Sequence, residues 1–319
     1  MTFKSTTKAA LIAAFLTGSF AATHSAFAQG EDGTKAQRNL QIIAEMLPGR
    51  YDNANQSYFD RRLKKPEGQR HARSALQVAR LDAPDISAAV FRATLSRGEA
   101  AAQSFVYALN VDEKDSEAVR MRVYAADAAA DVGKDSYLKG CDLLWREEAG
   151  QFAGSVESSR KCKSKHAATA MLLSEDALWA DFKDSDQGYF TLERARSFSC
   201  YVDVPGVGGG RDIPYKRYEI ADIHDKGGKE WIALDDGSEV SITLTNVRWP
   251  MNNLKGIFTR HSFVMYVGKR ENGEEREVSY AWTLPTAPRI GMNLKWMLVN
   301  CYMLSSEDVT PFFKDEPLP

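Results

Sequence analysis

Residues 230–247 read EWIALDDGSEVSITLTNV, and this stretch predicts the fold class of the second half of the chain. Its centre, Asp235-Asp236-Gly237, is typical of a tight turn between two strands. After the turn, apolar residues alternate with polar ones: Val240, Ile242 and Leu244. Such alternation is typical of a strand with one buried face. The stretch therefore predicts an antiparallel β-hairpin with strands at 230–234 and 239–247.

The same pattern continues on both sides of this hairpin. A second turn of this kind is Glu271-Asn272-Gly273. The further strands that we predict are 198–204, 261–269, 275–283 and 296–304. We therefore expect residues 195–304 to form one antiparallel β domain, followed by a loosely held tail, 305–319, which is rich in acid and proline.

The first residues of the chain have the pattern of a secretory signal peptide. Lys4 and Lys8 come before an apolar run at 9–16. Ala26-Phe27-Ala28 then has the small-x-small pattern of a cleavage site. We therefore expect residues 1–28 to be removed on export to a bacterial periplasm. No other apolar stretch approaches the ~20 residues that span a bilayer, so we expect no membrane span.

Composition excludes two classes of protein. The formal net charge is −2, and it becomes −4 without the two leader lysines, whereas a nucleic-acid binder needs a basic surplus. The hydrophobic fraction of 44% is too high for a disordered chain. We therefore expect a folded, exported protein with no nucleic-acid partner.

The cysteines indicate disulfides rather than a metal site. There are four, an even number behind an export signal: Cys141, Cys162, Cys200 and Cys301. Three pairings are open. Pairing Cys141 with Cys162 would close a loop that one hairpin can span, and would leave Cys200 and Cys301 to join the first and last strands of the C-terminal domain. Free thiols or a zinc site are the alternatives, and no C-x-x-C pair supports zinc.

The N-terminal half begins with a helical pattern. Apolar residues recur at helical spacing before the stop signal Pro48-Gly49: Leu40, Ile43, Ala44 and Leu47. We predict a second short helix at 115–124, where an Asp-Ser start precedes three apolar residues. Beyond about residue 135 the pattern indicates strands and tight turns.

Motifs that would identify a reaction are absent from the sequence. It contains no G-x-S-x-G, H-E-x-x-H, Walker or G-x-G-x-x-G motif in a suitable context. The glycine-rich run at 206–210 lacks a following helix start, so a flexible loop is favoured over a phosphate site. His224-Asp225 has the composition of a catalytic pair, but neighbours on a strand point to opposite faces.

One segment is unusually basic. Seven cationic residues and one histidine fall within residues 61–80: Arg61, Arg62, Lys64, Lys65, Arg70, His71, Arg73 and Arg80. Bidentate arginines there could bind a carboxylate or phosphate. A solvated face is the more frequent explanation, because Asp60, Glu67 and Asp82 offset part of the charge.

Several motifs in the first half together resemble one family. The segments that carry the resemblance are LPGRYDNANQ at 47–56, RMRVY at 120–124, GCDLLW at 140–145, FAGSV at 152–156 with Cys162, Ser174-Glu175, and Asp186-x-Gly188. In order and approximate spacing they resemble the T-type phycobiliprotein chromophore lyases, the CpcT/CpeT family. The resemblance covers about residues 38–194, and we recognise no family for 195–319.

This resemblance implies a fold and a ligand for residues 29–194. The fold would be a lipocalin-like antiparallel β-barrel with a short N-terminal helix, and the pocket that the barrel encloses would hold a linear tetrapyrrole (bilin). The residues that the resemblance would place at the ligand are Tyr51, Asn53, Gln56, Arg120, Arg122, Tyr124, Asp142 and Trp145. Arg120 and Arg122 would face the same way and pair with the propionates, and Asp142 would meet a pyrrole N–H. Alternatively, Gly49, Trp145 and Gly154 serve only the bends and core of the barrel.

Two features differ from the family. The strand before the R-x-R-x-Y segment reads FVYALN at 105–110 and lacks the Glu that family members often carry there. Phycobiliproteins are assembled in the cytoplasm, whereas this chain carries an export signal.

Three functions therefore stay open. The first, which we favour, is a periplasmic binder of a tetrapyrrole or similar amphipathic molecule, with the C-terminal domain as lid, protein-binding module or second half of a fused barrel. The second is an active bilin lyase on an exported acceptor. The third is an envelope interaction protein whose barrel is filled with side chains. We predict no metal site and no cofactor other than a bound tetrapyrrole.

Overall fold

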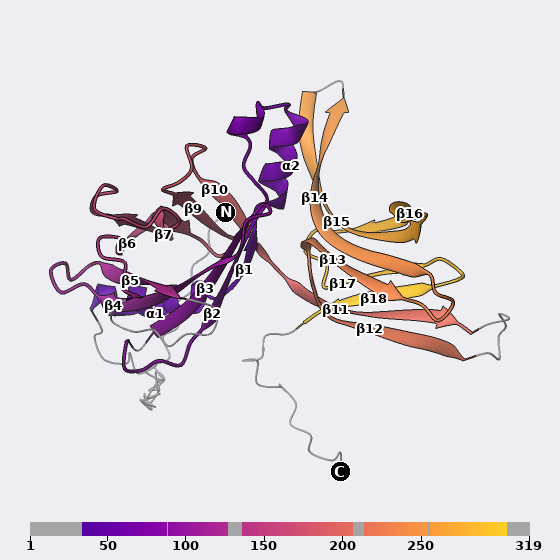
Figure 1. Ribbon diagram of the computed structural model, residues 1–319, viewed down its shortest axis with the longest axis horizontal. Coiled ribbons are helices and arrows are strands. Elements are labelled where there is room, and N and C mark those ends of the chain that lie inside the picture. The colour runs from indigo at the N-terminus through magenta and orange to yellow at the C-terminus, as the bar shows by residue number, and fades with distance from the viewer. Residues whose placement is uncertain (1–33, 88, 127–135, 207–213, 254–255, 305–319) are drawn as a thin grey trace, which may run out of the picture. The chain divides into compact units, whose positions relative to one another are not determined.

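The computed structural model describes residues 34–304 except 88, 127–135, 207–213 and 254–255. The predicted signal peptide, most of the glycine-rich run at 206–210 and the predicted tail at 305–319 lie outside the described residues. In the described part of the chain the fold is mainly β, as predicted, with a closed barrel followed by two further antiparallel sheets (Figure 1). None of the helices described is long and apolar enough to cross a membrane.

The predicted N-terminal helix is confirmed as α1 (Lys35–Met46). It begins with a capping box, in which Thr34 and Gln37 bind each other's backbone N–H groups, and its last backbone bond is made at Leu47. Its apolar side packs against β4 and β5 (bounds below), and Ile43 and Ala44 belong to the barrel core. A second helix, α2 (Ala54–Arg62), and a 3₁₀ turn at Glu67–Gln69 were not predicted.

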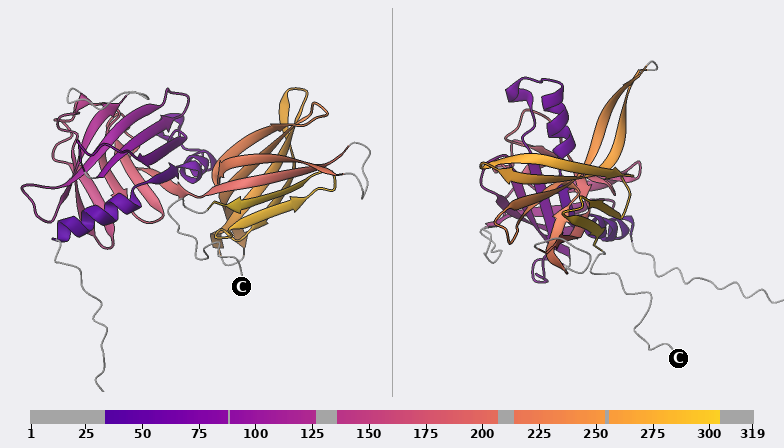
Figure 2. Two further views of the ribbon diagram at one scale, coloured as in Figure 1. Left: turned by 90° about the horizontal axis from the view of Figure 1, so that it is seen from below. Right: turned by 90° about the vertical axis from the view of Figure 1, so that its right-hand side faces the viewer.

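Ten antiparallel strands close the barrel. They are β1 (Gly49–Asp52), β2 (Ser74–Arg80), β3 (Ala89–Arg97), β4 (Gln103–Val111), β5 (Val119–Ala126), β6 (Leu143–Glu148), β7 (Gln151–Val156), β8 (Ala168–Leu173), β9 (Ala177–Phe182) and β10 (Phe190–Ala195). Each strand pairs with its neighbours along the chain, and β1 pairs with both β2 and β10. The left view of Figure 2 shows these strands wrapping around a common axis.

The helix predicted at 115–124 is wrong, because most of this segment is strand β5. Val119, Met121 and Val123 are buried, whereas the residues between them are partly exposed. This period of two fits a strand, and β-branched valines favour a strand over a helix. The Asp-Ser start belongs to the turn before β5, where the backbone N–H of Ala118 bonds to the carbonyl of Asp115.

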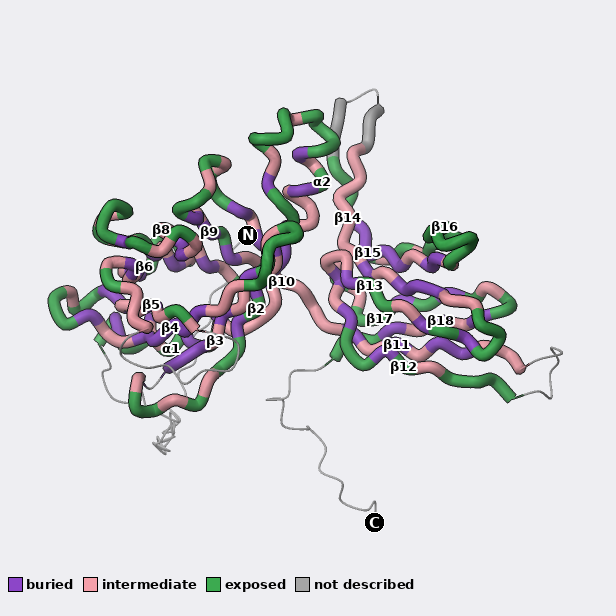
Figure 3. Tube along the Cα trace, viewed as in Figure 1, coloured by how far each residue is buried: buried purple, intermediate pink, exposed green. Residues whose placement is uncertain are grey.

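The interior of the barrel is a packed apolar core. Along most of the strands, buried positions alternate with more exposed ones, whereas β4 is buried on both faces over Phe105–Leu109 (Figure 3). The largest buried side chains of this core are Trp145, Tyr51, Phe91 and Phe190. Inward-facing side chains therefore occupy much of the space that the resemblance would give to a ligand.

The residues after Ala195 form two four-stranded antiparallel sheets. One has the order β12-β11-β18-β17 and the other the order β13-β14-β15-β16. Their strands are β11 (Ser197–Pro205), β12 (Tyr215–His224), β13 (Lys226–Ala233), β14 (Glu239–Asn253), β15 (Gly256–Glu271), β16 (Glu274–Thr283), β17 (Arg289–Asn293) and β18 (Leu298–Met303). Phe198 of the first sheet and Phe263 of the second meet in a common core, with ring centroids 4.9 Å apart.

Both predicted hairpins are confirmed, as β13–β14 and β15–β16. In the second turn Asn272 and Gly273 have φ values of 52° and 84°, as a tight hairpin turn requires.

The four cysteines form two disulfides, in the pairing expected from loop length. Cys141–Cys162 spans the β6–β7 hairpin. Cys200–Cys301 joins β11 and β18, which are the first and last strands of the C-terminal sheets and directly paired neighbours. All four cysteines are fully buried.

Candidate ligand-binding site

The residues that the resemblance assigns to the ligand do not meet in one pocket. Tyr51 and Trp145 face the barrel core and are fully buried. The Tyr51 hydroxyl donates to the carbonyl oxygens of Met46 and Leu47, at 3.0 Å each, and accepts from Arg194. Burial raises the pKa of Tyr51 to about 12, so the hydroxyl stays protonated and fastens α1 to the barrel.

Asn53 and Gln56 bind backbone groups. The side-chain amide of Asn53 donates to the carbonyl of Ala72 at 2.8 Å and accepts from the N–H of Ser74 at 2.7 Å. Gln56 donates to the carbonyl of Tyr189 and accepts from the N–H of Thr191. These two side chains therefore tie the start of α2 to neighbouring segments of the barrel.

Trp145 packs against a glycine of the next strand. A Cβ atom on Gly154 would lie 2.6 Å from two atoms of the indole ring, so only glycine leaves room for the ring. Within the described part of the chain the indole N–H has no hydrogen-bond partner. This geometry favours the structural role for Trp145 and Gly154.

Arg120, Arg122 and Tyr124 face the outside of the barrel, because they alternate along β5 with the three buried residues. Tyr124 belongs to a small apolar cluster on the outer wall, and its ring lies 5.5 Å from that of Tyr137. The Tyr137 hydroxyl donates to the carboxylate of Asp142 at 2.9 Å. Burial, and then Asp142, raise the pKa of Tyr137 to about 12.

Arg120 is held by two carboxylates. Its Nε lies 2.5 Å from Asp112 Oδ2, and one terminal nitrogen lies 3.4 Å from Asp142 Oδ2. Burial acts to raise the pKa of Asp112. Hydrogen bonds from Arg120 and from the backbone N–H groups of Lys114 and Asp115 together outweigh burial and lower it. Arg122, in contrast, makes no salt bridge with any residue that the structure describes.

Beside Arg120 and Asp142 lies a cleft of about 630 Å³, which we call the basic cleft. It is lined by Arg120, Lys139, Gly140, Asp142, Glu157, Arg160, Lys161 and Lys163. Five of these residues are cationic and two are acidic. Lys161 lies 3.6 Å from Glu157 and Arg120 is paired as above, whereas Lys139, Arg160 and Lys163 make no salt bridge with described residues.

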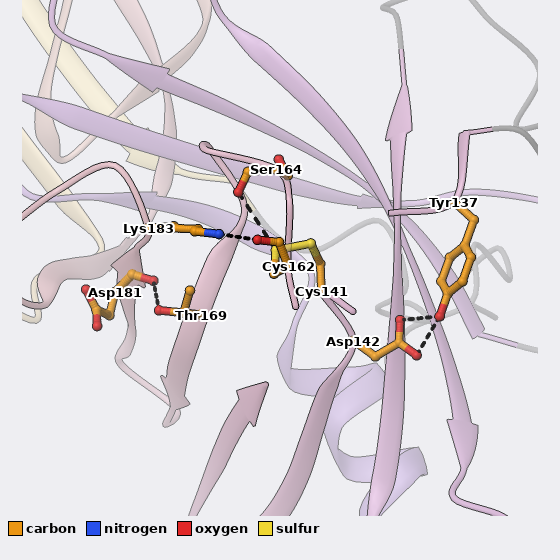
Figure 4. The surroundings of a disulfide bond; sticks show 8 residues. All are labelled: Tyr137, Cys141, Asp142, Cys162, Ser164, Thr169, Asp181 and Lys183. Carbon is orange, nitrogen blue, oxygen red and sulfur yellow. Dashed lines mark hydrogen bonds between the residues drawn. A yellow bond between two sulfur atoms is a disulfide. The ribbon is translucent and has the colours of Figure 1, made fainter. Parts of the chain in front are cut away.

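The two loops that carry these cations are fastened together. The Cys141–Cys162 disulfide joins them, and the Lys183 ammonium donates to the carbonyl of Cys162 (Figure 4). Gly140 has φ +82°, and a Cβ there would lie 2.7 Å from the Lys161 carbonyl oxygen. The loops therefore approach each other closely, and the arrangement of cations is preorganised.

Sequence reasoning identified Arg120 and Asp142 but missed three cations, Lys139, Arg160 and Lys163. The signal that would have found them is their position beside the cysteines. Lys139 precedes Cys141 by two positions, and Lys161 and Lys163 flank Cys162. Once those two cysteines are paired, the lysines must lie close together.

The basic segment at 61–80 is not one patch of free cations. Asp60, which is buried, binds the backbone N–H of His71 at 2.8 Å and the Lys65 ammonium at 2.6 Å. Arg73 lies 2.8 Å from the buried carboxylate of Asp52. These contacts fit the expectation that acids offset much of the charge.

The side chains of His224 and Asp225 are not hydrogen-bonded to each other and have different partners. The carboxylate of Asp225 binds Arg196 at 2.7 Å and Asn246 at 2.6 Å. His224 accepts at Nδ1 from the N–H of Lys226, and burial is the largest cause that lowers its pKa to about 4. Among the described residues no group of three or more His, Cys, Asp or Glu side chains is arranged to hold a metal ion.

Comparison of the chain with models of known families, with curated proteins and with solved structures finds no match. The resemblance to the CpcT/CpeT family therefore stays a prediction.

Proposed function

We propose that this chain is an exported binding protein for a flat, amphipathic small molecule with two carboxylates, of the linear tetrapyrrole class. The proposed site is the basic cleft. The observation that carries the proposal is that three cations with no salt bridge to any described residue, Lys139, Arg160 and Lys163, surround a cavity of about 630 Å³ between two fastened loops. This volume lies within the range of about 300–1,000 Å³ that is usual for small-molecule sites.

The two carboxylates of the ligand would pair with these cations. Hydrogen bonds between ionised partners are about twice as strong as neutral ones, and arginine binds a carboxylate through two nitrogens. Arg120 would take part less, because Asp112 and Asp142 already compensate its charge. The rings of Tyr124 and Tyr137 lie on the same outer wall and offer an apolar surface nearby.

The outer wall is favoured over the barrel interior as the ligand's location. Trp145, Phe91 and Phe190 are almost fully buried in the interior. A tetrapyrrole placed among them would have to displace several packed rings, and burial of one such side chain is worth about 1.5–3 kcal/mol. The site on the outer wall requires no such rearrangement.

Binding without catalysis is the better-supported role. All four cysteines of the chain are in disulfides, so the oxidised chain has no thiol to which a bilin could be attached. An active lyase would need an acceptor cysteine on a separate exported protein. The predicted signal peptide at 1–28 supports a periplasmic location.

A second candidate role, protein interaction through the C-terminal sheets, rests on edge strand β16. Val278, Tyr280 and Trp282 lie on one face of it and are 46%, 55% and 55% exposed. An antiparallel pair of two β16 strands centred on Tyr280 would place Val278 of each copy opposite Trp282 of the other, as a twofold interface requires. Sedimentation velocity tests this role. We expect a dimer that Trp282→Lys dissociates, and a monomer at every concentration would contradict it.

The ligand proposal is tested by an absorbance titration of the chain from Gln29 onward with biliverdin. The matched probe is biliverdin dimethyl ester, which keeps the chromophore but lacks both negative charges. We expect a saturable, red-shifted spectrum with biliverdin and a much weaker one with the ester. Equal binding of acid and ester would contradict the role of the cations, and no spectral change with biliverdin, phycocyanobilin or haem would contradict the proposed ligand class.

A further inference from the structure

A second cavity, of about 430 Å³, lies at the end of the barrel where β3 and β9 finish. We call it the mouth pocket. Its apolar part consists of the exposed residues Ala72, Ala100 and Ala101 together with Leu95 and Phe190, two residues of the barrel core that are each 2% exposed. Its polar part includes Arg97, His166, Asp184 and Asp186. None of these residues belongs to the basic cleft.

Arg97 crosses the end of the barrel. It lies at the end of β3, whereas Asp184 follows β9, and these strands are separated by β2, β1 and β10 in the shorter direction around the barrel. Its guanidinium donates to both carboxylate oxygens of Asp184, one of them at 2.7 Å, and its Cζ lies 5.0 Å from the Phe182 ring centroid. This contact spans the barrel end and forms one wall of the pocket.

His166 completes this wall. Its Nδ1 lies 2.8 Å from Asp184 Oδ2 and 3.3 Å from an Arg97 nitrogen. Burial acts to raise the pKa of Asp184, but the hydrogen bonds from Arg97 and His166 outweigh it and lower this pKa. The positive charge of Arg97 is therefore compensated within the wall, and both oxygens of Asp184 are occupied.

One carboxylate of the pocket has no ion-pair partner among the described residues. This is Asp186, which is exposed, whereas Arg97 and Asp184 compensate each other. A ligand for this pocket therefore needs an apolar body for the exposed alanines of its lining, Ala72, Ala100 and Ala101, and a positively charged group for Asp186. An anion would meet repulsion from Asp186.

We propose that the mouth pocket is a second ligand site, which binds a small organic cation, namely a primary amine on an apolar ring or chain. The amine lies beside Asp186, and the apolar body lies on Ala72, Ala100 and Ala101, close to the core residues Leu95 and Phe190. This site takes a ligand of opposite charge to the one proposed for the basic cleft, so the two proposals can fail independently.

Three probes of almost equal shape test this inference: benzylamine, benzyl alcohol and benzoate, which are cationic, neutral and anionic. Methyl and ring NMR signals of Leu95 and Phe190 report on the site directly. We expect benzylamine to shift these signals saturably, benzyl alcohol to bind more weakly and benzoate not to bind. We expect Asp186→Asn to weaken benzylamine at least about tenfold, whereas the control Asp236→Asn, in the turn between β13 and β14, leaves the affinity unchanged.

Other outcomes would overturn the inference. Equal affinities for the three probes would show that charge plays no part, and unchanged benzylamine binding by the Asp186→Asn variant would remove Asp186 from the site. No shift of the Leu95 and Phe190 signals with any probe would show that the pocket takes no ligand of this kind. Because biliverdin is absent from this experiment, none of these outcomes bears on the basic cleft.

Discussion

Gly140 and Lys161 are in direct contact across the basic cleft: a Cβ atom on Gly140 would lie 2.7 Å from the Lys161 carbonyl oxygen. Gly140 precedes Cys141 and Lys161 precedes Cys162, so the contact and the disulfide fasten the same two loops. The loops carry the cations that we assign to the ligand. The binding of an anionic ligand should therefore depend on groups that never touch it.

Replacing Gly140 by alanine tests this contact. Gly140 and Gly150 have φ values of +82° and +79°, but nothing lies within 4 Å of a Cβ built on Gly150. Both Gly→Ala variants should lose about 1–2 kcal/mol because of the left-handed backbone. Gly140→Ala should lose about 1–3 kcal/mol more through overpacking. Urea unfolding measures both free energies, and equal losses would contradict the close contact.

Removing the disulfides one at a time separates the cleft from the C-terminal sheets. The double variant Cys141→Ala/Cys162→Ala opens a loop with a sequence separation of 21, and should lose roughly 3 kcal/mol and most of its biliverdin affinity. Cys200→Ala/Cys301→Ala opens a separation of 101 and should lose roughly 4.7 kcal/mol, with biliverdin affinity retained. Thermal unfolding measures the stability of the two double variants, and absorbance titration measures their affinity for biliverdin. Full biliverdin affinity in the variant without Cys141–Cys162 would contradict the role of this disulfide in holding the two loops of the basic cleft.

Much of the fold could be predicted from the sequence, because its signals are local. Both hairpins combine a turn containing Asp-Gly or Asn-Gly with alternating apolar residues, and α1 combines helical spacing with a Pro-Gly stop. The segment at 115–124 misled us, because its Asp-Ser start also suits a turn and its valines suit a strand. Helix α2 was missed because it has little apolar periodicity, and it is held by tertiary contacts such as that of Gln56 with Tyr189.

The site was harder to predict than the fold. Arg120 and Asp142 do lie at a cleft, but Tyr51 and Trp145 belong to the core, and this difference depends on which face of a strand each residue occupies. A motif gives residue identities and order, whereas the face depends on the register of the closed barrel. Lys139 and Lys163 become neighbours only through a disulfide, so no motif of adjacent residues includes both.

Replacing Gly154 by alanine tests the packed barrel interior. The new methyl group would lie 2.6 Å from the Trp145 ring, so we expect a loss of about 1–3 kcal/mol in the free energy of unfolding. The control is Gly68→Ala, where nothing lies within 4 Å and φ is not in the left-handed region. Thermal unfolding should show a clear loss for the first variant and almost none for the second. A Gly154→Ala variant as stable as the control would indicate a loosely filled barrel.

The ion pair of Asp112 with Arg120 predicts a dependence of stability on pH. The pKa of Asp112 in the folded chain lies below its ordinary value of 3.8, so at low pH the unfolded chain takes up this proton first. The stabilisation is therefore complete well above 3.8 and is lost as the pH falls through the folded pKa. Urea unfolding between about pH 6 and about pH 2 should show a shallower decline for Asp112→Asn than for the unmodified chain. Parallel declines would contradict a lowered pKa for Asp112.

The central claim, that the basic cleft binds an anionic amphipathic ligand, is tested most directly by the biliverdin Kd of one triple variant. Lys139→Gln/Arg160→Gln/Lys163→Gln removes the three cleft cations that make no salt bridge within the described part of the chain. Its control, Lys35→Gln/Arg62→Gln/Lys295→Gln, removes the same residue types from exposed positions elsewhere. We predict that the cleft variant raises Kd at least about tenfold, or about 1.4 kcal/mol, and that the control raises it less than about twofold. Equal Kd values for the two variants would contradict the claim.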